Sequence, residues 1–293
     1  MSSNTIILEK IKENRPRLSL SSLKTYGSVL KNLRKNMDGG DDLDWFSQND
    51  KDILDYLENK TPQTKKTTLS ALFVLTKKQS YKDVMMEVMK TVNESNKDQK
   101  MNEKQRENWI SINEIQSIYD NLLVKIKLML TNKSIMNEPT MMEFLLVSFL
   151  GGISNLAPRR SMDYSEMKVR NYDAKTDNYY KAGKFYFNIY KTSKDYGLQI
   201  VDVAKDLNVI LKKWVKINAN DHMLYSTNGN KLTSPQITRI LNKVFGGKNV
   251  STSMLRHIYL TSIYKDLPAI NKMQQIATNM GHSISTAMEY IKK

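Results

Sequence analysis

Apolar residues recur at helical spacing through most of the first 95 positions of the chain. Leu23, Leu30 and Leu33 fall on one face of a helix that Ser19 is suited to cap. A glycine-containing polar run at 38–41 ends this helix, and Pro62 separates the next two. The pattern predicts further helices at 50–58, from about 63, and at 82–92. We therefore expect residues 1–95 to form a small all-helical domain.

A polar stretch with alternating charges and no apolar period follows the predicted bundle. Such a composition is typical of a connecting segment, so we expect a linker over residues 96–108. Ser111 and Glu114, three positions apart, make a capping-box pattern that starts a new helix. The sequence thus predicts a second domain over residues 109–293.

The second domain combines helical periodicity with one predicted β-hairpin. Residues 185–190 and 198–203 alternate and are rich in aromatic and β-branched side chains, with a turn expected at 194–197. We expect a fold that is mainly α with a small β-sheet or hairpin, of the α+β class. The helices predicted in this domain are 141–153, 207–217, 234–245, 252–264, 269–279 and 284–291.

The excess of basic over acidic residues favours a polyanionic partner. Lys plus Arg number 45 and Asp plus Glu 30, a formal charge of +15. Nucleic acid is the first partner such an excess favours and an acidic membrane surface the second, although it also fits a solubilising surface. The chain has no cysteine, which excludes disulfides and thiolate chemistry. Without an apolar run of about 18–20 residues or a signal-peptide pattern, we expect a soluble intracellular protein that does not enter membranes.

Five residues from separate segments make a set suited to attack on a phosphodiester. Arginine binds phosphate oxygens through a planar fork that stays charged, which suits Arg160 and Arg256 to a charged transition state. The other three would handle proton transfer and attack; they are Lys191, His282 and Tyr290. Such a reaction needs no metal and no nucleotide cofactor.

Each of these residues has a separate role in the predicted reaction. Lys191 would protonate the leaving 5′-hydroxyl, with Lys194 as the alternate. His282 would hydrogen-bond a non-bridging oxygen or the phenol, and Tyr290 would be the nucleophile. Each also has a plainer interpretation: a lone tyrosine is usually an exposed aromatic, and a histidine after Gly281 is usually a surface residue beyond a helix cap. The weight lies in their joint order.

The short motifs that contain these residues resemble the active-site boxes of the tyrosine recombinase (phage integrase) family, and the resemblance covers nearly the whole chain. Within this family the chain is most similar to integrases of eukaryotic DNA viruses and virophage-like mobile elements. The boxes are PRRSMD at 158–163, YKTSK at 190–194, SMLRH at 253–257, and MGHS at 280–283 with Tyr290 beyond.

The resemblance implies how the chain would bind DNA. A helical core-binding domain and a catalytic domain would form a clamp around double-stranded DNA, and four copies would act on paired sites. Strands would be cleaved and rejoined through a 3′-phosphotyrosyl intermediate, with no small-molecule substrate. The basic residues expected to contact DNA are Lys24, Lys31, Arg34, Lys65, Lys66, Lys77, Arg159 and Lys194.

The sequence departs from the family pattern at Ser253, where a histidine is usual. Serine can donate a hydrogen bond to phosphate but cannot act as a general base near neutral pH. Two other hypotheses therefore stay open beside a site-specific recombinase. One is a type IB topoisomerase or telomere resolvase with the same chemistry, and the other is a DNA-binding protein with a decayed site. Whether the protein acts in the host nucleus or in the cytoplasm or a viral factory is also left open.

Overall fold

The computed structural model describes residues 3–97, 99–132, 137–265, 267–279 and 283–285, and these are mostly helical. The chain divides into two compact units, one of Met1–Lys100 with Pro268–Lys293 and one of Met101–Leu267. The domain boundaries expected from the sequence stay a prediction, and each unit is described by itself. The expected fold class, mainly α with a small sheet, is confirmed.

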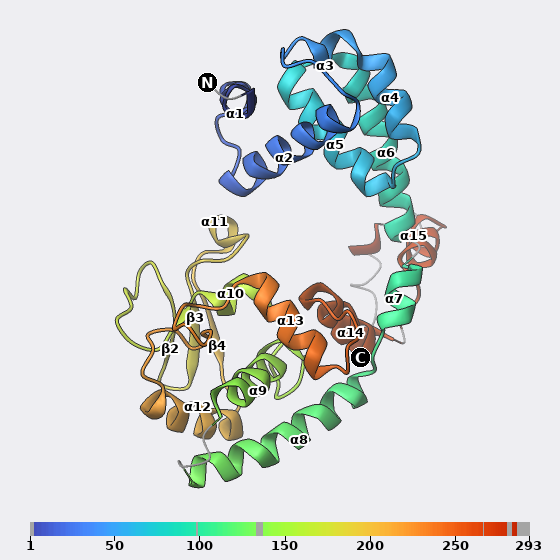
Figure 1. The fold of residues 1–293 in the computed structure, drawn as a ribbon. Helices are drawn as coiled ribbons and strands as arrows, with labels where there is room; N and C mark the ends of the chain where they lie inside the picture. Colours follow the sequence, from blue (N-terminus) through green and yellow to red (C-terminus); the bar gives the residue numbers. More distant parts are fainter. Residues whose placement is uncertain (1–2, 98, 133–136, 266, 280–282, 286–293) are drawn as a thin grey trace. The chain divides into compact units, whose positions relative to one another are not determined.

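The first unit is an all-helical bundle (Figure 1). Ser19 caps its second helix by accepting a hydrogen bond from the main-chain N–H of Ser22, and Thr61 caps another through Thr64. Leu30, Phe46 and Leu72 are fully buried in its core. The helices are α1 (Ser3–Asn14), α2 (Leu20–Asn36), α3 (Trp45–Gln48), α4 (Asp50–Glu58), α5 (Pro62–Thr76), α6 (Gln79–Lys97) and α15 (Ile270–Asn279).

The second unit is built around one buried helix, α9 (Glu138–Leu150). Nearly every residue of α9 from Met141 onward is buried, because the helix is apolar on all sides. Phe149 stacks on Tyr164 and meets the edge of Phe185, which joins α9 to the sheet. The other helices are α7 (Glu103–Asn108), α8 (Ile112–Thr131), α10 (Ser161–Ser165), α11 (Ser193–Tyr196), α12 (Lys205–Ile217), α13 (Ser234–Val244) and α14 (Thr252–Tyr264).

Capping boxes begin several helices of this unit, α7 and α8 among them. Ser111 and Glu114 form the predicted box at the start of α8, with both reciprocal hydrogen bonds present. Asn102 and Gln105 form a second box at the start of α7. The polar stretch expected to be a linker therefore holds a short helix, since caps can start a helix that lacks an apolar face.

The sheet has four strands in the order β1-β2-β3-β4 (Figure 1). The first pair is parallel and the other two are antiparallel, with Tyr179 opposite Tyr186 and Tyr186 opposite Ile200. Phe185 and Phe187 point into the core. The strands are β1 (Met167–Lys168), β2 (Asn178–Lys181), β3 (Lys184–Phe187) and β4 (Gln199–Asp202).

The predicted hairpin is right in its strand pairing and wrong in its turn. Strands β3 and β4 pair as expected, but residues 188–198 join them through the helical turn α11. The tight turn lies instead between β2 and β3, where Ala182 and Gly183 have φ values of 51° and 82°. Two successive positive φ values match the twist of a two-residue hairpin. Alanine rarely adopts such a φ, so the sequence carries little signal for this turn.

Candidate active site

The first arginine box lies at the entrance to α10. Arg160 is the N-cap residue, with extended φ and ψ of −72° and 149°, and its main-chain oxygen accepts a hydrogen bond from the N–H of Asp163 at 3.0 Å. Asp163 lies in the first turn and is only 2% exposed. The backbone thus turns the carboxyl of Asp163 into the protein directly after the arginine pair.

The positive charges of three arginines counteract the effect of burial on the pKa of the Asp163 carboxyl. Arg159 donates a hydrogen bond from Nε to Oδ2 at 2.9 Å. Burial raises the pKa of Asp163, and the positive charges of three arginines oppose that rise. In order of effect they are Arg159, Arg160 and Arg256. Arg160 and Arg256, which are far apart in the sequence, therefore both influence the pKa of the same carboxyl.

Helix α14 carries the second arginine box. Ser251 caps it by accepting from the N–H of Met254 at 3.2 Å, and Leu255 packs in the core. Arg256 is half-buried, and Ser253 is exposed in the first turn. Within the described part of the chain, Arg160 and Arg256 form no hydrogen bond or ion pair through their guanidinium groups. Both are thus available to bind an anion.

A glycine holds the end of α9 close to α14. Gly152 has φ of +74°, and a Cβ built on it would lie 2.5 Å from the ring of Tyr259. Any larger residue would therefore push Tyr259 aside as well as strain the backbone. This contact ties the helix that carries Arg256 to the central buried helix.

The two candidate lysines lie in the segment 188–198, which we call the lysine loop. Lys191 is exposed between β3 and α11, and Lys194 is exposed within α11. Among the described residues, neither forms an ion pair with the Asp163 group. His282 and Tyr290 lie outside the described residues, so their predicted roles stay predictions.

Arg159 has a role that sequence reasoning missed. The sequence predicted a DNA contact for this residue. In the structure its guanidinium is already engaged, because it pairs with Asp163 and donates to Gln199 Oε1 at 2.7 Å. The only sequence signal was an acid four positions on, which is meaningful in a helix but not at the extended entrance to one.

The basic residues predicted to contact DNA in the first unit differ in exposure. Lys24, Lys31 and Lys77 are exposed, and Lys65 and Lys66 are half-exposed. Arg34 is only 8% exposed, with its guanidinium 4.9 Å above the ring of Phe46. Its Nη2 also donates to the main-chain oxygen of Asp42 at 3.2 Å. Arg34 therefore packs against the core of its own unit.

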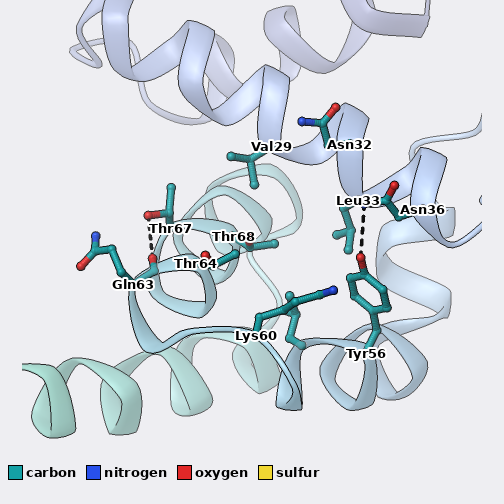
Figure 2. Close-up of a pocket in the computed structure, with 11 residues that line it drawn as sticks. Val29, Asn32, Leu33, Asn36, Tyr56, Lys60, Gln63, Thr64, Thr67 and Thr68 are labelled. Carbon is teal, nitrogen blue, oxygen red and sulfur yellow. Dashed lines mark hydrogen bonds between the residues drawn. The ribbon is translucent and has the colours of Figure 1, made fainter. Parts of the chain in front are cut away.

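The first unit also has a hollow of about 460 Å³ between α2, α4 and α5 (Figure 2). Asn32, Asn36 and Gln63 contribute amides to its wall. Tyr56 accepts a hydrogen bond from Asn36 Nδ2 at 3.2 Å, and Lys60 lies 4.3 Å above its ring. Lys60 and then Asn36 lower the pKa of this phenol. The lysines predicted to contact DNA do not line this hollow.

The described residues lack both a cluster of metal ligands and an apolar membrane-spanning helix. No group of three or more His, Cys, Asp or Glu side chains among them could hold a metal ion. None of the helices in that same part of the chain is long and apolar enough to cross a bilayer.

Among solved structures, the chain is similar to the crystal structure of XerA recombinase. The TM-score is 0.36 and the sequence identity 17%, over 98% of this chain and 93% of that chain. No protein-family profile matches the chain, and no curated protein matches it.

Proposed function

We propose that the protein is a site-specific DNA recombinase of the tyrosine type, acting as an integrase of a viral or mobile element. One observation carries the proposal: the charges of Arg160 and Arg256 both oppose the rise that burial causes in the pKa of Asp163, and neither guanidinium forms a hydrogen bond or ion pair within the described residues. With Arg159, three arginine charges oppose one carboxylate. The cluster is thus net positive and suits a phosphate group.

The proposed reaction exchanges one phosphoester for another. The phenol of Tyr290 gives its proton to solvent water as its oxygen attacks a DNA phosphorus. The bond from phosphorus to the 5′-oxygen breaks, and Lys191 gives that oxygen a proton. Attack by the 5′-hydroxyl of another strand reverses the step and frees the tyrosine. No oxidant, metal or nucleotide enters the balance.

The arginines would act on charge that develops in the transition state. As the pentacoordinate phosphorus forms, Arg160 and Arg256 would donate to its non-bridging oxygens, with His282 and Ser253 as further donors. Preorganised donors of this kind contribute about 3–4 kcal/mol each. Asp163 would keep these side chains near one point before DNA arrives.

The wider organisation belongs to the same proposal. The partner is double-stranded DNA, held between a helical domain of residues 1–95 and a catalytic domain of residues 109–293, with four copies on paired sites. The exposed lysines of the first unit would contact the phosphate backbone, which positions a protein without reading sequence.

Ser253 supports a second candidate, a DNA-binding protein with a decayed site. Its side chain is exposed in the first turn of α14, where a histidine base would be expected. Serine lacks a group that titrates near neutral pH. This candidate predicts tight, salt-sensitive binding without strand cleavage.

Substitution of the two arginines tests the main candidate. The substrates are DNA duplexes from the ends of the viral or mobile element that encodes the protein. We would measure their cleavage and binding by Arg160→Ala, Arg256→Ala and the control Arg239→Ala. Arg239 is exposed on α13, outside this cluster. The first two variants should lose about 10²–10³-fold in cleavage while affinity changes little. Cleavage at the wild-type rate by both would refute the proposal.

A further inference from the structure

The guanidinium of Arg159 contacts both ends of the lysine loop. Its Nη1 donates to Gln199 at the start of β4, at 2.7 Å. Its Cζ lies 4.0 Å from the ring centre of Phe187, at the end of β3, and 5.1 Å from that of Tyr190, inside the loop. On the opposite side, Nε pairs with Asp163 at 2.9 Å. The side chain of Arg159 therefore joins the lysine loop to Asp163.

A hydrogen bond within the lysine loop also brings together the residues on either side of Lys191 and Lys194. The hydroxyl of Tyr190 donates to the main-chain oxygen of Gly197 at 2.6 Å, and its ring is buried. Lys191 and Lys194 lie between these two residues and are exposed. Arg159 packs on the same Tyr190 ring, so the position of the closed segment depends on Arg159.

Arginine is suited to this position and lysine is not. The planar group presents donors in two directions, toward Asp163 and Gln199, while its face lies against aromatic rings. A lysine ammonium carries the same charge at a single point and cannot do both. The contacts therefore depend on the shape of the guanidinium as well as on its charge.

We propose that Arg159 is a positioning residue that fixes the lysine loop, and with it Lys191, against the Asp163 cluster. This inference rests on the proposed function, because Lys191 matters only if it protonates the leaving oxygen. It replaces the interpretation of Arg159 as a DNA contact. Arg159 would act on the reaction through Lys191 without touching DNA.

Two variants and two substrates test this role. Arg159→Lys keeps the charge and the trypsin site, and Gln199→Ala removes only the loop-side hydrogen bond, so one remains informative if the other folds poorly. The substrates are a normal duplex and one with sulfur in place of the bridging 5′-oxygen at the cleavage site. A thiolate leaves without a proton, so the sulfur substrate does not need Lys191.

Both variants should cleave the normal duplex about 10–100-fold more slowly, within the range of general-acid effects. On the sulfur substrate their rates should return to within about 3-fold of wild type. Trypsin should cut after Lys191 and Lys194 about 10-fold faster than in wild type, because the loop opens locally. Arg239→Lys, the exposed control, should change none of these.

The contrary results separate the two proposals. An equal loss on both substrates, or a lower DNA affinity with a shallower salt dependence, would overturn the positioning role of Arg159. The positioning role would also be overturned if the variants showed the wild-type trypsin pattern. If wild type were active in that case, the recombinase proposal would stand. If wild type forms no adduct on either substrate, the proposed function fails, and with it the effect of Arg159 on the reaction.

Discussion

Asn178 pairs with the main chain of Ile189 through both ends of its amide. Its Oδ1 accepts from the N–H of Ile189 at 2.7 Å, and its Nδ2 donates to the oxygen of Ile189 at 2.7 Å. Nδ2 also donates to the main-chain oxygen of Asp163 at 2.9 Å. One fully buried side chain on β2 thus holds both the start of the lysine loop and the helix of the first arginine box.

Asn178→Ala should destabilise the second unit strongly. It removes the side-chain partner of main-chain groups of Asp163 and Ile189, at about 1–3 kcal/mol for each group left unsatisfied. We expect the free energy of unfolding in urea to fall by about 2–4 kcal/mol. Gln116→Ala, which removes one exposed hydrogen bond to Asp120 on α8, should change it by less than about 0.5 kcal/mol. Equal effects would show that the Asn178 bonds contribute little.

Asp50 should make the stability of the first unit depend on pH. Lys78 and then Ser80 lower its pKa through hydrogen bonds of 2.8 Å each. Because the folded-state pKa is depressed, the stabilisation is fully present above the unfolded pKa of about 3.9 and is lost as pH falls through the lower folded value. Asp50→Asn should therefore cost about 1 kcal/mol at pH 7 and progressively less below about pH 4.

Asp52→Asn is the matched control for this pH dependence. Asp52 lies in the same first turn of α4 and is exposed, so both variants lose the same favourable interaction with the helix N-terminus. The difference between the two variants isolates the contacts of Asp50. A difference that is constant from pH 7 to pH 3 would contradict this account.

The exposed lysines and the buried Arg34 should behave differently in DNA binding. Lys24→Ala and Lys31→Ala should each flatten the slope of log affinity against log salt by about 0.9, as expected for one lost phosphate contact. Arg34→Ala should leave that slope unchanged and lower the free energy of unfolding by about 1–3 kcal/mol, because its contacts lie within the first unit. A flatter slope for Arg34→Ala with unchanged stability would reverse the assignment.

Ser253→His tests whether a missing base limits the reaction. The position is exposed in the first turn of α14, so a histidine side chain can be accommodated there. General-base catalysis typically contributes 10²–10⁴-fold, and even a poorly aligned histidine should raise the cleavage rate at pH 7 by about 10-fold. Ser253→Asn, which cannot accept the proton, is the control. Equal rates for both variants and wild type would show that loss of the phenol proton is not limiting.

Local signals predicted the helices well. The structure begins and ends α4 and α14 at the residues that apolar spacing indicated, and Ser19 and Ser111 cap their helices as expected. Helix periodicity and capping depend on residues a few positions apart, so the sequence carries them directly. Strand pairing of β3 with β4 was also predictable, since both segments alternate.

Features that depend on distant contacts were not predictable. The turn at Ala182 relies on the surrounding sheet to hold an alanine at positive φ. The lysine loop takes its shape from Asn178, Tyr190 and Arg159, which lie on different elements. Motif order identified Arg160 and Arg256 as candidates, but their common acid became visible only in the packed unit.

A tyrosine nucleophile at Tyr290 would leave the protein covalently joined to DNA, and this adduct can be detected on a gel. We would incubate nicked duplexes from the ends of the encoding element with the full chain in excess EDTA and separate the products on a denaturing gel. We expect a slowly migrating protein–DNA band that is absent for Tyr290→Phe. DNA binding without such a band, or an equal band from Tyr290→Phe, would contradict the assignment of Tyr290 as the nucleophile.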